Sequence, residues 1–231
     1  AALDAEVERV IFTSSDKAVN PTNVMGASKM MGERLVIAAN EIRGLKRTRF
    51  AAVRFGNVIG SRGSVVPIFA GQLLRGEPLT VTHDEMSRYV MTIGEAARLV
   101  LEAGERMLGG EIFVTKMRAL NVRDLASAMA DAFGKPGHEI VRTGLRPGEK
   151  LYEELISDEE AARTVDLERL LVILPADESG LTALRRHYDG ARRVKKQWHS
   201  ANDEKMTTDE IRRYLSDHRI LEPYLRPGGL L

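Results

Sequence analysis

The sequence contains 231 residues, of which 43% are hydrophobic, so the chain is long enough and apolar enough to bury a substantial core. A formal net charge of +1 gives no electrostatic reason to expect a nucleic acid or an anionic membrane as a partner. Cysteine is absent, which excludes disulfides, thiol nucleophiles and thiolate metal sites, and is consistent with a reducing cytosol.

The first residues, Ala1-Ala2-Leu3-Asp4-Ala5, contain no initiator methionine and no targeting signal, and they read as the end of a helix that began earlier. We therefore expect the chain to be a fragment. No apolar stretch approaches the ~20 residues that a membrane-spanning helix needs. We expect no membrane span in this chain and a cytoplasmic location.

A short apolar run, Val10 to Ser14, contains β-branched residues and ends in hydroxyls, which is typical of a buried parallel strand. Ser15-Asp16-Lys17 follows it directly, and a turn there would aim the acid and the amine in the same direction. The next predicted strand, Phe50 to Phe55, is followed closely by Asn57. Ligands collect beyond the carboxyl ends of strands in open α/β sheets, so these polar residues should converge.

A helix is predicted between the two strands. It begins at a capping residue, Asn23 or Thr22, and ends near Gly44. Met25 and Lys29 are four residues apart, so they share a face of this helix and point together at the end of the preceding strand. This arrangement is typical of the wall of an active site.

Strands and helices alternate along the rest of the chain up to about residue 175, which predicts an α/β fold. Further helices are predicted at 66–75, 93–108 and 121–133, further strands at 78–82, 111–115 and 138–141, and polar loops at 82–89 and 144–150. Beyond Pro175 two helices are predicted, at 181–198 and 207–215, the second with a capping pattern. We expect residues 176–231 to form a helical tail that packs on the body or on another subunit of a homo-oligomer.

Three motifs carry a resemblance to a known family: Ser-Asp-Lys-Ala-Val at 15–19, Pro-Thr-Asn-Val-Met-Gly-Ala-Ser-Lys at 21–29, and Val-Arg-Phe-Gly-Asn-Val-Ile-Gly-Ser at 53–61. The spacing of serine, helical residue and lysine resembles the extended short-chain dehydrogenase/reductase superfamily. Within it, the motifs resemble the nucleotide-sugar 4,6-dehydratases of bacterial polysaccharide biosynthesis. They are most similar to the large, membrane-anchored branch that acts on UDP-N-acetylglucosamine, in which methionine replaces the usual tyrosine.

The resemblance runs from about Val7 to about Pro175. It implies that residues 1–175 are the C-terminal part of a Rossmann-like, doubly wound parallel sheet with interleaved segments that bind the nucleotide sugar in a small subdomain. It also implies NAD as the cofactor. No Gly-x-Gly-x-x-Gly motif is present, so most of the cofactor cradle would lie in a missing N-terminal part.

The reaction implied by the resemblance is an internal redox elimination. NAD takes hydride from sugar C4, the ketone acidifies the C5 proton, water leaves from C6, and the hydride returns to C6. By resemblance, Asp16 is the acid for the leaving hydroxyl and Lys17 the base at C5, with Ser15, Met25 and Lys29 completing the catalytic set. A thioether has no proton to exchange, so deprotonation of the C4 hydroxyl must fall on Ser15 with Lys29, on a water, or on Lys17.

Two kinds of binding residue are expected besides the catalytic set. Lys29 would hold the nicotinamide ribose, and Phe55 would contact the cofactor. Arginine suits the diphosphate of a UDP-sugar because its planar fork donates two charge-assisted hydrogen bonds, and a nearby carboxylate can accept from the ribose hydroxyls. The expected substrate-binding residues are Asn57, Val65, Val66, Arg88, Arg146 and Glu149.

Other kinds of site find little support in the sequence. The five histidines have no metal-ligand spacing, so we expect no metal site. The basic run from Arg192 to Lys196 is interpreted as a solvated helix face rather than a nucleic-acid contact.

Three functions therefore stay open at this stage. The first is 4,6-dehydration of a UDP-N-acetylhexosamine to a 4-keto-6-deoxy sugar nucleotide. A UDP-sugar 4-epimerase of the same superfamily is the alternative, although Asp16 and Lys17 favour dehydration because epimerisation expels no water. The third is a non-catalytic fragment that binds a nucleotide sugar.

Overall fold

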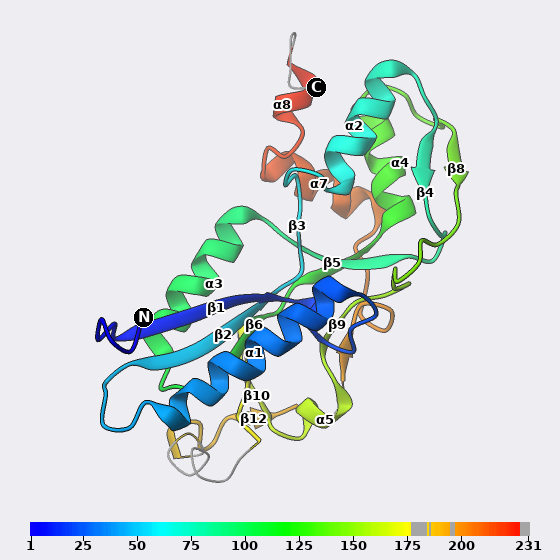
Figure 1. Cartoon of the computed structure of the whole chain (residues 1–231). Helices are drawn as coiled ribbons and strands as arrows, with labels where there is room; N and C mark the ends of the chain where they lie inside the picture. The colour runs from blue at the N-terminus through cyan, green and yellow to red at the C-terminus, as the bar shows by residue number, and fades with distance from the viewer. Residues whose placement is uncertain (177–183, 185, 195–196, 227–231) are drawn as a thin grey trace. The chain divides into compact units, whose positions relative to one another are not determined.

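The computed structural model describes residues 1–176, 184, 186–194 and 197–226, and their contacts divide them into two compact units (Figure 1). Unit 1 draws on residues 1–56, 94–116 and 154–199, and unit 2 on residues 57–93, 117–153 and 200–226. The chain therefore passes between the units several times. The predicted tail 176–231 is divided between the units, because its described residues up to 199 belong to unit 1 and the described residues 200–226 to unit 2.

Unit 1 is built on a mixed sheet in the order β1-β2-β6-β11-β10-β12. Strands β1, β2 and β6 are parallel to one another, and the pairings from β6 to β12 are antiparallel. The predicted α/β class is confirmed. The strands are β1 (Arg9–Ser15), β2 (Arg49–Phe55), β6 (Ile112–Thr115), β10 (Thr164–Leu167), β11 (Leu170–Ile173) and β12 (Arg192–Arg193).

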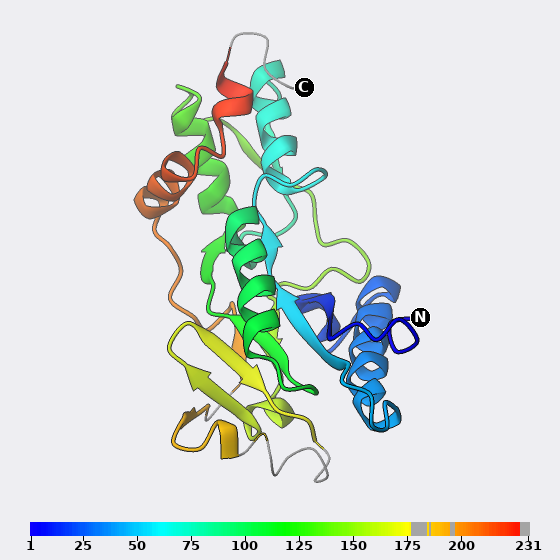
Figure 2. The same ribbon diagram turned by 90° about the vertical axis from the view of Figure 1, so that its left-hand side faces the viewer.

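Two long helices cover this sheet, α1 (Val24–Ile42) on one face and α3 (Ile93–Arg106) on the other (Figure 2). The alternation of side chains along β2 explains the two faces: Ala51 and Val53 pack with α3 in one apolar cluster, whereas Arg54 points to α1. The predicted helix and strands of this region are confirmed within one or two residues.

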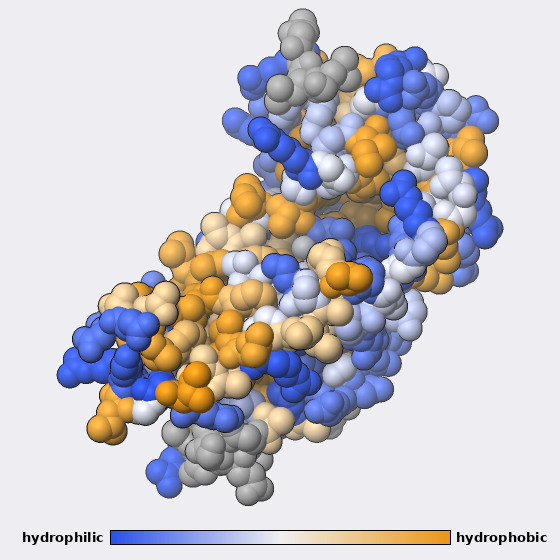
Figure 3. Space-filling view, viewed as in Figure 1, coloured by the Kyte–Doolittle hydropathy of each residue, from blue (hydrophilic) through white to orange (hydrophobic). Residues whose placement is uncertain are grey.

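Strand β1 is parallel, as predicted, but less buried than predicted. Val10, Ile11 and Phe12 are half-buried, because β1 pairs with β2 alone among the described strands. Helix α1 also exposes apolar side chains, including Met31 and Leu35 at 59% and 69% exposure. Figure 3 shows apolar side chains gathered over this helix.

Unit 2 contains four helices and two small sheets among its described residues. The helices are α2 (Val65–Arg75), α4 (Val122–Ala132), α7 (Thr208–Asp217) and α8 (Glu222–Leu225). The sheets are β3 (Asn57–Val58), β5 (Ser87–Met91) and β7 (Arg118–Asn121) in one, and β4 (Leu79–Val81) with β8 (Ile140–Arg142) in the other.

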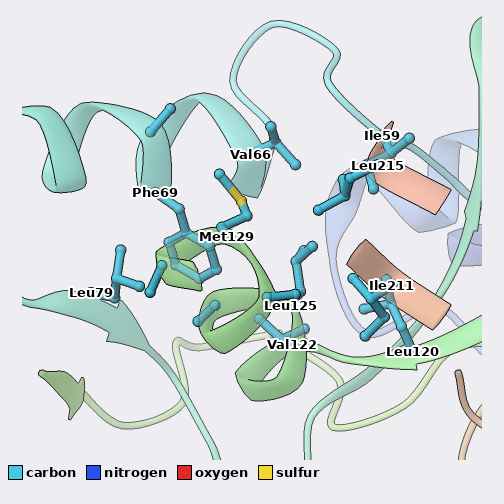
Figure 4. Packing of buried hydrophobic residues seen from close by; sticks show 14 of the residues in the cluster. Ile59, Val66, Phe69, Leu79, Leu120, Val122, Leu125, Met129, Ile211 and Leu215 are labelled. Atoms are coloured by element: carbon cyan, nitrogen blue, oxygen red, sulfur yellow. The ribbon is translucent and has the colours of Figure 1, made fainter. Parts of the chain in front are cut away.

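The core of unit 2 lies between its helices. Figure 4 shows side chains of α2, α4, β4 and α7 pointing toward one another, with Phe69, Met129 and Ile211 fully buried. Helix α7 confirms the helix predicted at 207–215, and its start carries a complete capping box between Thr207 and Glu210. Burying α7 against α4 fixes this part of the tail on unit 2.

Two predictions of local structure are wrong. Residues 87–89, predicted as loop, lie in β5 and pair with β7. In the predicted helix 181–198, the described residues 184, 186 and 187 are helical, but Arg192–Arg193 form β12 and Trp198–His199 form β13, which pairs with β9 (Glu154–Ile156). Residues 177–183, 185 and 195–196 lie outside the described residues. In both places pairing with a strand distant in the sequence outweighs the local pattern.

Candidate active site

Strand β1 ends in a hydrogen-bonded cluster of the three residues predicted from its sequence. The short helix η1 (Asp16–Ala18) begins at once after the strand, with Ser15 as its cap. The Ser15 hydroxyl donates to Asp16 Oδ1 at 2.8 Å, and Lys17 Nζ donates to the same oxygen at 2.9 Å. The turn of η1 therefore brings hydroxyl, acid and amine together, which a continued strand would not do.

The Asp16 carboxylate is the most enclosed group of this cluster. Its side chain is 0% exposed, and its second oxygen, Oδ2, is buried and has no hydrogen-bond partner among the described residues, whereas the Lys17 side chain is 27% exposed. A buried oxygen without a partner costs free energy, and such oxygens are rare enough in folded proteins to need a reason. Asp16 thus has one oxygen that accepts two hydrogen bonds and one that no described residue satisfies.

The start of α1 is held directly against η1. Asn23 caps the helix by accepting from the Gly26 amide at 2.9 Å, as predicted. A Cβ on Gly26 would lie 2.3 Å from the Lys17 carbonyl oxygen, so only glycine allows this approach. The sequence therefore needs glycine here to bring the first turn of α1 onto the backbone of Lys17.

Lys29 and Met25 occupy the first two turns of α1. Lys29 is half-buried, and its Nζ donates to the Thr13 carbonyl oxygen at 2.9 Å and lies 5.2 Å from the centre of the Phe12 ring. Met25 is 48% exposed, so it does not fill a core. The hydrogen bond thus fixes Lys29 to the carboxyl-terminal half of β1, at a residue, Thr13, that precedes Ser15 by two positions.

Phe55 ends β2, and its register partner in β1 is Ser15. Phe55 is half-buried and packs against the apolar cluster on the α3 face of the sheet. Ser15 and Phe55 are therefore adjacent at the carboxyl ends of neighbouring parallel strands. Asn57, which was expected to converge with Ser15 to Lys17, belongs to unit 2.

A buried ion network beside this cluster was missed at the sequence level. The Arg54 guanidinium, 3% exposed, makes two-point hydrogen bonds to Glu33 of α1 and to Glu160 of α5 (Asp158–Ala161). Burial alone would raise the pKa of Glu160, but the hydrogen bonds and charge of Arg54 lower it to about 2. The sequence did contain an indication of this network, because an arginine inside an apolar strand is buried and therefore needs charged partners.

The predicted substrate-binding residues all lie in unit 2, and five of the six line one cavity of about 260 Å³. These five are Asn57, Val65, Arg88, Arg146 and Glu149. Val66 does not contribute, because it is 0% exposed and packs in the core of the unit with Phe69 (Figure 4). The remaining lining is mostly apolar and includes Ile68, Val81 and Met86.

Two segments position the polar groups of this cavity. Arg88 lies in β5 rather than in a loop, and its guanidinium donates to the carbonyl oxygens of Ser87 and Lys150 at 2.7 and 2.8 Å. Glu149 Oε1 lies 3.9 Å from Arg88 Nη2, and its Oε2 accepts from the Arg146 amide at 3.1 Å. The Arg146 side chain is exposed. Arg88 thus ties the 146–149 turn to the sheet and leaves Arg146 free to meet an anion.

The described residues contain no group of three or more acidic or histidine side chains placed to hold a metal ion. None of their helices combines the length and the apolar character that crossing a membrane requires. The predicted catalytic and cofactor residues lie in unit 1 and the predicted substrate residues in unit 2.

A family model described as "Polysaccharide biosynthesis protein" matches residues 1–175. An uncharacterised membrane protein of Methanocaldococcus jannaschii is 48% identical over 78% of this chain and 56% of its own length. A UDP-N-acetylglucosamine 4,6-dehydratase (inverting) of Campylobacter jejuni is 41% identical over 76% of this chain and 52% of its own length. A UDP-glucose 4-epimerase of Rickettsia canadensis is 38% identical over 93% of this chain and 63% of its own length. The chain thus spans between about half and two thirds of these relatives.

Solved structures show the same architecture. Pen from Bacillus thuringiensis superposes with a TM-score of 0.84 at 36% identity, covering 95% of this chain and 65% of that one. A Thermus thermophilus UDP-glucose 4-epimerase in complex with NAD superposes with a TM-score of 0.56 at 22% identity, covering 94% and 66%. The second likeness concerns the fold alone.

Proposed function

Because the chain belongs to the polysaccharide biosynthesis protein family, we propose that it is part of an NAD-dependent 4,6-dehydratase that converts UDP-N-acetylglucosamine to a 4-keto-6-deoxy sugar nucleotide for polysaccharide or glycan synthesis. One observation carries the proposal: the hydrogen-bonded cluster of Ser15, Asp16 and Lys17 at the end of β1. Elimination of water needs an acid and a base within reach of neighbouring carbons, and this cluster offers both.

The proposed roles are those that the family resemblance implies, and the geometry of each group supports them. Asp16 Oδ2, which accepts no hydrogen bond from the described residues, is the oxygen that would carry a proton to the leaving C6 hydroxyl. Lys17, which is partly exposed, would take the C5 proton, and its contact with Asp16 Oδ1 places base and acid side by side. Ser15, which donates to the same oxygen, would orient the acid and contact the C4 hydroxyl.

The residues near the carboxyl ends of strands β1 and β2 in unit 1 are of the kind that can hold a nicotinamide cofactor. Lys29 Nζ, next to the Thr13 carbonyl oxygen, would hold the nicotinamide ribose, and Phe55 beside Ser15 would contact the ring. When bound, NAD supplies the acceptor and donor of the hydride that leaves C4 and arrives at C6. Met25 has no exchangeable proton, so Ser15 and Lys29 would take the C4 hydroxyl proton.

The unit 2 cavity suits the UDP portion of the substrate. Its apolar lining, with Val65 at one side, can cover a flat base, and the exposed Arg146 can pair with a phosphate. Glu149 would accept from the ribose hydroxyls. Asn57 would contact the phosphate through its Nδ2 donor, or a sugar hydroxyl through its buried Oδ1, which has no hydrogen-bond partner among the described residues.

A second candidate is a UDP-sugar 4-epimerase. The observation that favours it is the longer match to the Rickettsia canadensis epimerase, which covers 93% of this chain against 76% for the dehydratase. An epimerase returns hydride to C4 and expels no water, so it has no use for an acid at C6. Asp16 therefore separates the two candidates.

The test is a product assay on the protein encoded by the complete gene, incubated with UDP-N-acetylglucosamine. Loss of one water from the sugar nucleotide, seen by mass spectrometry, with a 4-keto group, supports the dehydratase. Conversion to UDP-N-acetylgalactosamine at unchanged mass supports the epimerase. A protein that binds UDP but makes neither product leaves only a binding function.

A further inference from the structure

The side chain of Arg54 bonds to α1, β9 and α5, and two of these elements, α1 and β9, contact the short helix η1 that carries Asp16 and Lys17. Nε and Nη2 donate to the two oxygens of Glu33 at 2.8 and 2.7 Å, and Nη2 and Nη1 donate to those of Glu160 at 2.7 and 2.8 Å. Nη1 also donates to the Leu155 carbonyl oxygen at 3.0 Å. These bonds use all five N–H donors of the guanidinium.

The contact with Glu33 fixes the helix that carries Lys29 and Met25. Glu33 lies four residues after Lys29, so both point to the sheet from the same face of α1. Lys29 is bonded to β1 and Glu33, through Arg54, to β2. Two anchors one helical turn apart determine both the position and the rotation of the first half of α1.

The contact with Leu155 and Glu160 fixes the turn that carries Asp16 and Lys17. Leu155 lies in β9, and the neighbouring Glu154 accepts from Asn20 at 3.1 Å, two residues after η1 ends. Glu160 also closes the capping box of α5 with Ser157. One guanidinium therefore connects α1, β2 and β9, and β9 connects to η1.

Stability alone does not explain why a charged network occupies this place. Replacing a whole buried ion network with well-packed apolar residues is often neutral or favourable for stability, although removing one partner alone is destabilising because it leaves the other charges unpaired. The planar guanidinium of Arg54 adds a fixed geometry, because the two parallel hydrogen bonds of each bidentate pair form well in only one relative orientation of arginine and carboxylate. Arg54 also directly precedes Phe55, at the end of the central parallel strands.

We propose that Arg54 is a positioning residue for the proposed reaction: with Glu33 and Glu160 it holds Lys29 and the Asp16-Lys17 turn in their working arrangement without touching the substrate. This inference rests on the proposed function. Catalysis by positioned groups is sensitive to displacements on the order of 1 Å, which can cost about 100-fold in rate.

The experiment compares Arg54→Lys with the wild-type protein from the complete gene, using UDP-N-acetylglucosamine. Lysine keeps the charge and loses the fork. We expect kcat, per folded protein, to fall at least about 10-fold while KM changes by less than about threefold. The matched control is Arg75→Lys: Arg75 makes the same bidentate contact with Glu77, but on the surface, and its kcat should equal that of the wild type. A folded Arg54→Lys protein with wild-type kcat overturns the proposal.

Two additions keep the test decisive. If Arg54→Lys does not fold, Glu33→Gln removes one carboxylate and keeps the helix, and the same fall in kcat is expected; wild-type kcat overturns the proposal. Amide hydrogen exchange of residues 16–30 needs no activity, and we expect it to accelerate in both variants and not in Arg75→Lys. If the wild type makes no product, the proposed function fails, and unchanged exchange in this segment then overturns the positioning role separately.

Discussion

Replacing Glu160 by Gln should remove a measurable, pH-dependent part of the stability of the chain. In the folded protein the pKa of Glu160 falls from 4.5 to about 2, because the hydrogen bonds and charge of Arg54 outweigh the effect of burial. At about 1.36 kcal/mol per unit of pKa shift, this decrease in the pKa of Glu160 corresponds to about 3 kcal/mol of stability. For a chain of this size, that is a decrease in Tm of about 6–12 °C. Glutamine still closes the capping box with Ser157, so the local helix end is kept.

The direction of the Glu160 pKa shift determines the pH range over which the carboxylate stabilises the fold. A carboxylate whose folded pKa is depressed stabilises the protein fully above about pH 5, and this stability is lost as the pH falls through about 2. Because glutamine resembles the protonated acid, the wild type and Glu160→Gln should differ most at pH 7 and converge near pH 2. Urea unfolding at several pH values measures both curves.

Glu210→Gln is the matched control for this experiment. Glu210 also closes a capping box, with Thr207, and also pairs with an arginine, Arg118, but it lies on the surface. Solvent screens such a pair, so its replacement should change stability much less. If Glu160→Gln and the wild type kept a constant difference from pH 7 to pH 2, or if both glutamate variants behaved alike, the account of the buried network would be refuted.

Two further predictions concern the predicted sites of the two units. Gly26→Ala should destabilise the protein, because the new Cβ would lie 2.3 Å from the Lys17 carbonyl oxygen. Gly71→Ala, whose Cβ would meet only the flexible end of the Arg75 side chain, should stabilise the protein by up to about 1 kcal/mol. Thermal unfolding compares the two variants, and equal Tm values would contradict the packing of α1 on η1. Arg146→Ala should weaken UDP binding at least about 10-fold in calorimetry, while the exposed Arg142→Ala should not; equal losses would argue against a specific phosphate contact.

Much of the fold could be predicted because its signals are local. Asn23 and Asn121 cap α1 and α4 as their sequences indicate, and Thr207 opens α7 with a capping box. Capping and apolar spacing depend on residues a few positions apart, so a single sequence contains the whole signal. The strand and helix alternation likewise predicted the α/β class.

The failures arise where distant pairing decides the structure. Trp198 is in β13 because its partner is Ile156 in β9, and Tyr89 is in β5 because it pairs with Ala119 in β7. Neither partner is visible from the local pattern, which favoured a helix in one case and a loop in the other. The half-buried state of β1 has the same origin, since burial of a strand depends on its neighbours in the sheet.

The candidate sites show the same division. The Ser15-Asp16-Lys17 cluster lies within three consecutive residues, so the motif that carries the family resemblance contains all of it, and five of the six predicted substrate residues line one cavity. The Arg54 network was missed because Glu33 and Glu160 lie 21 and 106 positions away from Arg54. The local indication of the network is Arg54 itself, a charged residue inside the otherwise apolar strand β2. Val65 and Val66 were both expected to bind the substrate, but successive helical residues face different directions, so Val65 lines the cavity and Val66 packs in the core.

Asp16→Asn, measured on UDP-N-acetylglucosamine with the protein from the complete gene, tests the central claim most directly. Asparagine keeps the size of the side chain and one acceptor for Ser15, but it cannot donate the proton to the leaving hydroxyl. Removing one placed proton-transfer group should lower kcat about 10²–10⁴-fold with KM nearly unchanged, and Asp217→Asn on the surface should have no effect. An Asp16→Asn protein that released water from the sugar at the wild-type rate would contradict the account.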